Sequence, residues 1–278
     1  MPEFLRQTVD SLRKATAPAR AEMNLRVRRE QFPLTLTAAV DVHENLRRLT
    51  FTAPELADFV PTGLDEQCGL LLPPEGVRLQ LPDLLTGSVR HALAAIPADL
   101  RPTLRWYVVR AHRPEAAEID VEVVLHDDGP GTAWARTAEV GTQVGFRAGS
   151  SGYRPPSAGA RQLLVADETA LPALAAILER LPLQEEPVHS IVEVPSARYR
   201  LTIDTPYPVE WVYRNQGDPG SRAAYAVKTS PVDRLAYAWV CGEVGLATGI
   251  RKYLVKERDV DADAIFFSGF WKKGSPAG

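Results

Sequence analysis

An arginine and a tyrosine stand two positions apart in the segment RWYVVR, residues 105–110. Because side chains alternate along a β-strand, we expect Arg105 and Tyr107 on one face. The ring can stack on a planar cofactor such as a flavin, and the guanidinium can bind a phosphate through two hydrogen bonds. A strand with an incidental surface arginine has the same spacing, and the spacing alone favours that simpler interpretation.

A Gly-Pro-Gly turn at residues 129–131 follows a strand that ends at His126 and precedes a helix that begins near Ala133 and Trp134. Backbone N–H groups at the start of a helix, together with the helix dipole, favour a pyrophosphate. An ordinary strand–turn–helix junction has the same composition. The turn alone therefore does not establish a phosphate site.

Two further segments bring polar residues to the point where a strand meets a helix. VADETALPAL places Asp167 and Thr169 there, and WVCGE places Gly242 and Glu243. Ligands of open α/β sheets bind at the carboxyl ends of the strands. Helix capping explains the first segment equally well, and the glycine-rich dinucleotide fingerprint is absent.

The segment GFWKKG near the C-terminus sets Phe270 and Trp271 beside Lys272 and Lys273. An aromatic ring there can cover a flavin face, although a tryptophan in the core with solvated lysines is the simpler alternative. The sequence shows no Ser–His–Asp or Cys–His arrangement and no outstanding carboxylate pair. We therefore expect neither acid–base catalytic residues nor a metal site.

The composition limits the class of protein. The chain has 278 residues, 45% hydrophobic and 24% charged, which allows a substantial core and one or two domains. A net charge of -3 argues against a nucleic-acid binder. Without an apolar run of about 18 residues or a signal peptide, we expect no membrane span and a cytoplasmic protein. Cys68 and Cys241 are expected to be buried free thiols.

Short alternating segments separated by Gly, Pro and Asp fill residues 25–152 and predict an antiparallel β-barrel, interrupted by a loop and short helix at 83–100. Residues 1–24 predict an amphipathic helical appendage, which serves docking or a partner. A Gly/Ser/Pro-rich stretch at 150–160 separates the barrel from residues 153–278. There strands and helices alternate, which predicts a parallel α/β domain.

Taken in order, these segments resemble the siderophore-interacting protein family, whose members are FAD-dependent, NAD(P)H-linked ferric-siderophore reductases of the ferredoxin-reductase-like superfamily. RWYVVR resembles the family's Arg-x-Tyr-Thr-x-Arg flavin motif, and EIDVEVVLHDDGPGTAWA its long strand and pyrophosphate turn. LLVADETALPALAAILERLP is the most specific block, and EVP, WVCGE and SGFWKKG resemble Glu-Val-Pro, Trp-x-x-Gly-Glu and Gly-Tyr-Trp. The resemblance covers roughly residues 25–274. It implies a flavin-binding barrel followed by a nucleotide-binding α/β domain.

The resemblance also implies roles for matching positions. The residues expected to bind FAD are Arg105, Tyr107, Val108, His126, Trp134, Ala135, Asp167, Thr169 and Ala170. Those expected to face NADH or NADPH are Gly242, Glu243, Phe270 and Trp271. Cations expected to bind a ferric siderophore are Arg251, Lys252, Lys272 and Lys273. A ferredoxin is the alternative electron donor.

Three positions depart from the family pattern. Val108 stands where a Thr or Ser hydroxyl usually approaches flavin N5, Ala166 replaces a glycine, and Gly69 stands where a lysine is usual. These departures motivate a second hypothesis, a flavin reductase or diaphorase with a different acceptor. A third hypothesis is a non-catalytic binding protein on the same fold.

Overall fold

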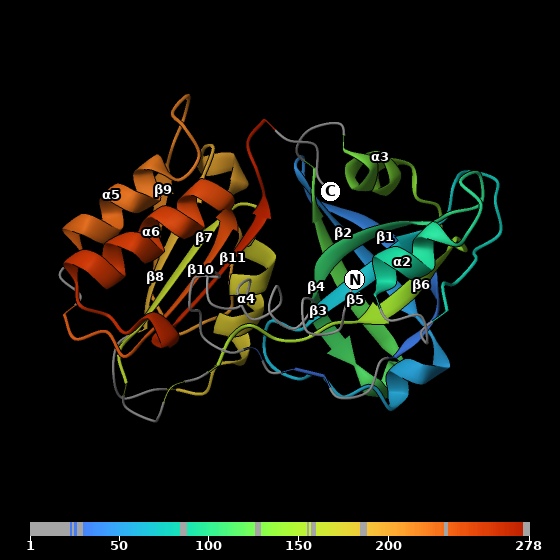
Figure 1. Cartoon of the computed structure of the whole chain (residues 1–278), viewed down its shortest axis with the longest axis horizontal. Coiled ribbons are helices and arrows are strands. Elements are labelled where there is room, and N and C mark those ends of the chain that lie inside the picture. The colour runs from blue at the N-terminus through green and yellow to red at the C-terminus, as the bar shows by residue number, and fades with distance from the viewer. Residues whose placement is uncertain are drawn as a thin grey trace, which may run out of the picture.

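The computed structural model describes residues 23, 25–26, 30–83, 88–125, 129–154, 156, 160–183, 188–230 and 233–274. The helix expected within residues 1–24 and the candidate ligand His126 lie outside the described residues. Two domains stand side by side, a barrel and a parallel sheet flanked by helices (Figure 1). None of the described helices is both long and apolar enough to cross a membrane.

The first domain is a closed antiparallel barrel with the strand order β1-β2-β5-β4-β3-β6, which confirms the expected architecture. Its strands are β1 (Gln31–His43), β2 (Leu46–Thr52), β3 (Gln67–Leu72), β4 (Thr103–Arg113), β5 (Glu118–Val124) and β6 (Gln143–Ala148). Helix α2 (Val89–Ala94) lies in the interval where a short helix was expected, and α3 (Pro130–Thr137) packs against β2 and β5. Short 3₁₀ turns occur at η1 (Pro54–Ala57) and η2 (Pro114–Ala116).

Alternation along β5 shows how the barrel separates its core from its outer wall. Ile119, Val121 and Val123 are buried in the barrel core, and Asp120 and Glu122 lie between them in sequence on the opposite face. Irregular pairing in β1 and β4 marks bulges of the kind that bend strands around a barrel. The outer face of β4 packs against helix α4 (Leu171–Arg180) of the second domain, where Val108 joins the apolar cluster of that domain.

The second domain is a five-stranded parallel sheet in the order β11-β10-β7-β8-β9, again as expected. Its strands are β7 (Gln162–Asp167), β8 (Val188–Val194), β9 (Val209–Tyr213), β10 (Tyr237–Glu243) and β11 (Ile265–Trp271). Its helices are α4 (Leu171–Arg180), α5 (Ser221–Thr229) and α6 (Val244–Glu257), with 3₁₀ turns η3 (Ala197–Tyr199) and η4 (Ala262–Ala264). Helix α4 covers the barrel-facing side of the sheet, and α5 and α6 cover the other side (Figure 1).

Both faces of the sheet are apolar because both are covered by helices. Leu164 of β7 packs in the cluster beneath α4, and its neighbour Leu163 packs against α5 and α6. Cys68 and Cys241 are fully buried free thiols, as expected. The sheet therefore forms a rigid support whose strand ends point toward one edge.

Several contacts join the two domains. Arg110 of β4 donates to both carboxylate oxygens of Glu179 on α4, at 2.7 and 2.6 Å. Asp65 accepts hydrogen bonds from the Tyr153 amide at 2.8 Å and from the Trp239 indole at 3.0 Å. Since Asp65 precedes β3 and Trp239 lies in β10, one carboxylate ties the barrel to the sheet. The change of architecture lies between residues 149 and 161, and the boundary at 152/153 stays a prediction.

Candidate cofactor-binding site

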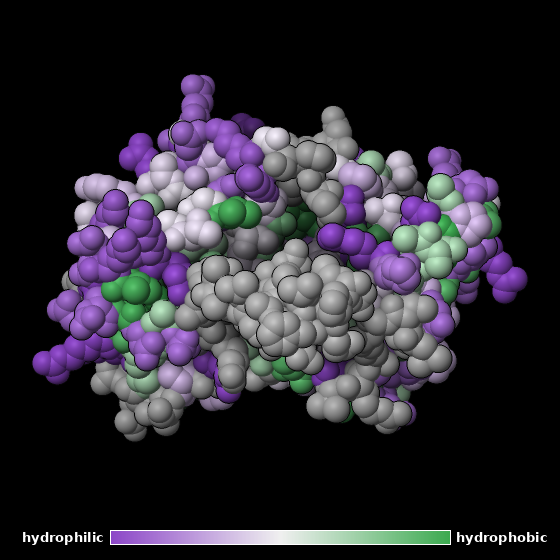
Figure 2. Space-filling model, viewed as in Figure 1, coloured by the Kyte–Doolittle hydropathy of each residue, from purple (hydrophilic) through white to green (hydrophobic). Residues whose placement is uncertain are grey.

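A cleft lies between the outer wall of the barrel and the carboxyl ends of β7 and β11. It consists of two adjoining cavities of about 310 and 160 Å³. Figure 2 shows a hollow between the two halves of the molecule, with hydrophobic atoms at its floor. The two cavities share the lining residues Trp106, Tyr107, Glu122, Thr169 and Phe270. We call this space the interdomain cleft.

Arg105 and Tyr107 share one face of β4, as strand alternation predicts. The start of helix α3 lies directly over them: a Cβ added to Gly131 would come within 2.5 Å of Tyr107 Oη and 3.4 Å of Arg105 Cγ. Burial, partly offset by the Arg105 charge, raises the pKa of Tyr107 to about 12, so the phenol is neutral at physiological pH. The arginine, the tyrosine and the helix start therefore form one cradle, which requires glycine at position 131.

Helix α3 begins with residues that have little or no side chain. Its N-cap is Gly129, Pro130 occupies the first helical position and has no N–H, and a Cβ on Gly129 would meet nothing within 4 Å. Gly129, Gly131 and Thr132 line the smaller cavity together with Arg105. A helix start of this kind, beside a guanidinium, has the donor chemistry that a pyrophosphate needs.

Val108 from the barrel and Thr169 from the sheet domain both line the larger cavity. Val108 belongs to the apolar cluster beneath α4 and is only 7% exposed, so this position offers no hydroxyl to a ligand. The Thr169 hydroxyl donates its hydrogen to Asp167 Oδ1 at 2.6 Å. Thr169 can therefore act toward a ligand in the cleft only as a hydrogen-bond acceptor.

A buried charge network forms the barrel side of the cleft. Glu122 lines both cavities; its Oε1 accepts from Arg48 at 2.6 and 3.1 Å, and its Oε2 lies 3.3 Å from Arg110 Nε. Burial opposes the charge on Arg110, but Glu179 and Glu122 outweigh it and raise the pKa of the guanidinium. Arg48 and Arg110 are both paired with carboxylates. They hold Glu122 in place and add no net positive charge to the cleft.

Asp167 joins three strands behind the cleft. Its Oδ1 accepts from the Thr169 and Ala170 amides at 2.9 and 3.3 Å, and its Oδ2 accepts from the Glu243 amide at 2.7 Å and the Trp271 indole at 2.9 Å. The carboxylate is fully buried, and burial, followed by the charge of Glu168, raises its pKa. Asp167 thus fixes the orientation of Trp271, and the cleft lining does not include Asp167 itself.

Gly242 is required by the same carboxylate. It adopts φ +139°, and a Cβ at this position would lie 2.5 Å from Asp167 Cγ. A side chain at position 242 would therefore be strained by the backbone and would collide with the carboxylate. The glycine in WVCGE serves the junction of β7 and β10 in the described structure.

Further carboxylates cap the helices that begin at this edge of the sheet. Glu243 accepts from the Gly245 and Leu246 amides at the start of α6. Glu193, at the end of β8, accepts from the Gly220 amide at 2.6 Å and the Ala223 amide at 2.9 Å at the start of α5. We call the four buried acidic residues here the carboxylate edge: Asp167, Glu168, Glu193 and Glu243.

The remaining candidate FAD residues lie outside the cleft lining. Ala135 is buried in the barrel core, and Ala170 is buried beneath the sheet. Trp134 lines a separate cavity of about 780 Å³ between α3 and the loop at residues 73–79. Of the candidate nucleotide residues, Phe270 lines both cavities of the cleft and Trp271 the smaller one.

The four candidate siderophore cations do not line the described cleft. Lys273 pairs with Asp218 at 2.5 Å, and the Arg251 guanidinium lies 4.9 Å from the centre of the Phe267 ring. Lys252 lines a groove between α5 and α6 on the outer side of the sheet, and Lys272 is exposed beyond β11.

Sequence reasoning missed Trp106 and Glu122, which line both cavities. The signal for Glu122 was present, because a charged residue between Val121 and Val123 in a barrel strand must face outward. No comparable signal pointed to Trp106. The residue is 49% exposed, and the sequence does not show which loops leave it uncovered.

Comparison with known proteins identifies the family of both domains. Residues 35–151 match the siderophore-interacting FAD-binding domain, and residues 159–274 match the siderophore-interacting protein domain. The chain is 30% identical over 242 residues to the ferric vibriobactin reductase ViuB of Vibrio cholerae, covering 84% of this chain and 86% of that protein.

Two solved structures share the fold. The siderophore-interacting protein SipS from Aeromonas hydrophila has a TM-score of 0.71 and 26% identity, over 88% of this chain and 92% of that one. A siderophore utilization protein from T. fusca has a TM-score of 0.75 and 24% identity, over 92% and 98%. This chain, with its N-terminal flavin-domain barrel and C-terminal parallel sheet, belongs to the siderophore-interacting protein family.

Proposed function

We propose that this chain is an FAD-dependent ferric-siderophore reductase that takes electrons from NADH or NADPH and releases iron as Fe(II). The observation that carries the proposal is the cradle of Arg105, Tyr107 and Gly131 at the start of α3, within the segment that matches an FAD-binding domain. The similarity to a protein named ferric vibriobactin reductase supports the choice of acceptor.

The residues of the cleft fit FAD. Arg105 and the start of α3 would hold the pyrophosphate, Tyr107 would contact the flavin, and Val108 and Thr169 would line the ring's pocket from either side. Trp134, Ala135, Asp167 and Ala170 would support these contacts from behind. Bound FAD supplies the exchange between a two-electron donor and a one-electron acceptor.

The chain's own part is binding and water exclusion. Trp106 and Phe270, which are 49% and 37% exposed, line both cavities of the cleft from the two domains. Ferric iron is held by hard oxygen ligands more strongly than ferrous iron, so reduction alone weakens the chelate. The reaction needs no acid–base pair, and we assign none.

A second candidate is a flavin reductase or diaphorase with a different acceptor. Among the described residues that line the two cavities of the cleft, the only lysine or arginine is Arg105, which we assign to the FAD pyrophosphate, and Glu122 is the only carboxylate. A cleft with this lining has little positive charge left to attract a polyanionic ferric chelate. A neutral acceptor such as a quinone meets no such mismatch.

The test uses protein loaded with FAD and reduced photochemically without air, so that the electron donor does not enter. The reduced protein is mixed with a ferric tris-catecholate, a ferric tris-hydroxamate or a quinone. Flavin reoxidation is followed by absorbance, and Fe(II) is trapped with ferrozine. Rapid reoxidation with one Fe(II) per electron supports the reductase. Reoxidation by the quinone alone would replace it with the second candidate, and failure to bind FAD would exclude both.

A further inference from the structure

The carboxyl edge of the parallel sheet is where a dinucleotide normally binds, because helix N-termini there offer amides to its pyrophosphate. In this chain all the backbone amides at the start of α5 already donate hydrogen bonds within the protein. Glu193 accepts from the Gly220, Arg222 and Ala223 amides, and the Ser221 amide donates to the Asp218 carbonyl.

The other two helices are occupied in a similar way. Glu243 takes the amides of Gly245 and Leu246 at the start of α6. Asp167 takes the amides of Thr169 and Ala170 before α4, and the second residue of α4 is Pro172, which has no N–H. The starts of α5 and α6 are therefore capped by the chain's own carboxylates, and at α4 Asp167 accepts the two amides that come just before the helix.

The charge at this edge also opposes a pyrophosphate. Four carboxylates are buried there, each at most 7% exposed. Arg214, at the end of β9, would be the natural partner for a phosphate. Its guanidinium is held instead by both oxygens of Glu168, one at 2.6 Å, and lies 3.8 Å from Glu193.

Apolar surface at the same edge remains available to a ring. Phe270 is 37% exposed and lines both cavities of the cleft, and Trp271 beside it is fixed by its hydrogen bond to Asp167. These two aromatic residues follow directly on Gly269, which also lines the larger cavity. A nicotinamide ring can therefore bind in the cleft, although the neighbouring sheet edge does not bind its pyrophosphate.

We propose that this chain recognises its nicotinamide donor by the nicotinamide end alone, because the carboxylate edge excludes the pyrophosphate and leaves the adenosine half unbound. The inference rests on the proposed function and specifies which part of the electron donor the protein recognises. The dihydronicotinamide is oxidised by loss of a hydride, which carries two electrons and one proton to the bound flavin. NADH, NADPH and phosphate-free reduced nicotinamide riboside are then equivalent donors.

The experiment follows flavin bleaching in the FAD-loaded full chain by anaerobic stopped flow. We expect the second-order rate constants for NADH, NADPH and reduced nicotinamide riboside to agree within about fivefold, with no saturation by either dinucleotide. A pyrophosphate held by two charge-assisted hydrogen bonds would favour dinucleotides about a hundredfold. That preference would overturn the inference, as would failure of all three donors to reduce the flavin.

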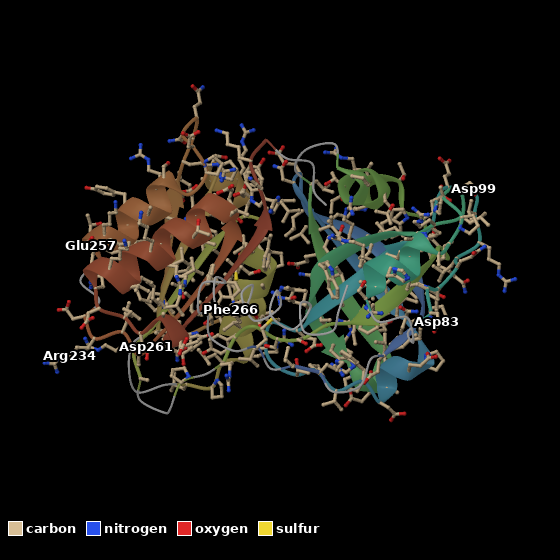
Figure 3. The ribbon with its side chains drawn as sticks, in the orientation of Figure 1. Asp83, Asp99, Arg234, Glu257, Asp261 and Phe266 are labelled. Carbon is tan, nitrogen blue, oxygen red and sulfur yellow. The ribbon has the colours of Figure 1, made fainter. Side chains whose placement is uncertain are left out.

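A substitution tests whether the carboxylate edge is what prevents binding of the pyrophosphate. Glu168→Gln removes one negative charge and loosens Arg214, so we expect reduction by NADH to accelerate about fivefold, by relief of like-charge repulsion, with the riboside unchanged. Glu257→Gln, at the outer end of the same domain (Figure 3), is the matched control and should change neither rate. Equal effects of Glu168→Gln on both donors would contradict the role of the edge.

The experiments distinguish failure of the proposed reductase function from failure of the proposed mode of donor recognition. The reductase is tested with photochemically reduced protein and no nicotinamide, so a negative result there does not involve the donor. The donor comparison in the unaltered protein stands even if the Glu168 variant folds poorly, which its FAD content and thermal midpoint would reveal. A dinucleotide preference in a protein that reduces ferric chelates would overturn this inference alone.

Discussion

Helix α3 begins beside the barrel with Gly129 and Pro130, whereas α5 and α6 begin at the edge of the sheet against Glu193 and Glu243. The N-cap of α3 has no side chain to accept its amides, and an arginine lies next to it in the cleft. The helix starts of the sheet domain receive carboxylates from their own chain. The same local geometry is thus prepared for an anion in one domain and already satisfied in the other.

The difference shows that fold alone does not determine where an anionic ligand binds. A parallel sheet with helices on both faces presents helix N-termini at one edge in every such protein. Whether these termini bind a ligand depends on the residue that follows each strand. Here three strand ends carry Asp167, Glu193 and Glu243, and on our proposal the anion is bound on the barrel side.

The largest expected effect is a loss of FAD affinity caused by a substitution on the barrel side. Gly131→Val places a branched side chain where even a Cβ lies 2.5 Å from Tyr107 Oη. Tyr107 and the start of α3 must move apart to make room, and restoring their contacts with FAD should cost roughly 3 kcal/mol, so FAD affinity should fall about a hundredfold. Titration of the apoprotein with FAD, followed by flavin fluorescence, measures the loss.

Gly129→Ala is the control for that experiment, because a Cβ at position 129 meets nothing within 4 Å. Its FAD affinity should stay within about twofold of the original, since an alanine N-cap costs α3 little in comparison. Equal losses in the two variants would show that general disturbance of α3, and not the contact with Tyr107, is responsible.

Arg105 provides the next largest effect. Arg105→Leu removes the cation beside the start of α3 and should weaken FAD binding by about 2 kcal/mol, or roughly thirtyfold. Arg105→Lys should recover only part of the loss, because an ammonium lacks the bidentate geometry of a guanidinium. The salt dependence of FAD binding should fall in the leucine variant, and an unchanged salt dependence would argue against a phosphate contact.

On the sheet side, Asp167→Asn replaces an acceptor that five donors surround. An amide nitrogen would face donors, so the free energy of unfolding should fall by about 2 kcal/mol in urea denaturation. FAD affinity should fall much less than in the Gly131 variant, since Asp167 lies behind the cleft. A loss of FAD binding without loss of stability would instead place this carboxylate in contact with the cofactor.

The same variant changes the response to pH. Burial and the charge of Glu168 raise the pKa of Asp167 above its ordinary value. The native protein therefore holds more protons than the unfolded chain between the ordinary and the raised pKa, and this contribution to stability is lost as the pH rises through that window. The stability advantage of the original protein over Asp167→Asn should shrink from pH 4 upward.

The smallest expected effect concerns the larger cavity. Val108→Thr introduces a hydroxyl of nearly the same volume, which can donate to a ligand in the cleft. A hydrogen bond of this type is worth about 1 kcal/mol, so the rate of flavin reduction should change by roughly fivefold. Val108→Ala removes bulk without adding a donor, and an equal change in that variant would assign the effect to packing.

Much of the fold could be predicted because barrel strands such as β5 alternate, the strands of the sheet are short apolar runs, and α6 buries a regular stripe. Strand β6 was not recognised as a separate strand of the expected barrel because Gly145 breaks an already short pattern, and α5 was missed because three of the five apolar residues in SRAAYAVKT are alanines. The position of Lys252 follows from helix periodicity: the buried residues of α6 include Ile250 and Leu254, so position 252 points away from the sheet.

The site was less accessible to sequence analysis for a physical reason. Arg105 and Tyr107 could be paired because the period of a strand is local. The cap that Glu193 provides to α5 joins residues 27 to 30 positions apart, and the fold of the intervening chain sets that distance. No periodicity in the sequence records such a contact, so the carboxylate edge could be recognised only in three dimensions.

The contact between Asp167 and Gly242 also has an evolutionary consequence. With a carboxylate at 167, any side chain at 242 would enter the space that the carboxylate fills, 2.5 Å from its carbon. Neither position can gain volume unless the other loses it, so single substitutions at 242 should be purged. We expect these two positions to covary among relatives, as an inherited pair separated by 75 residues of sequence.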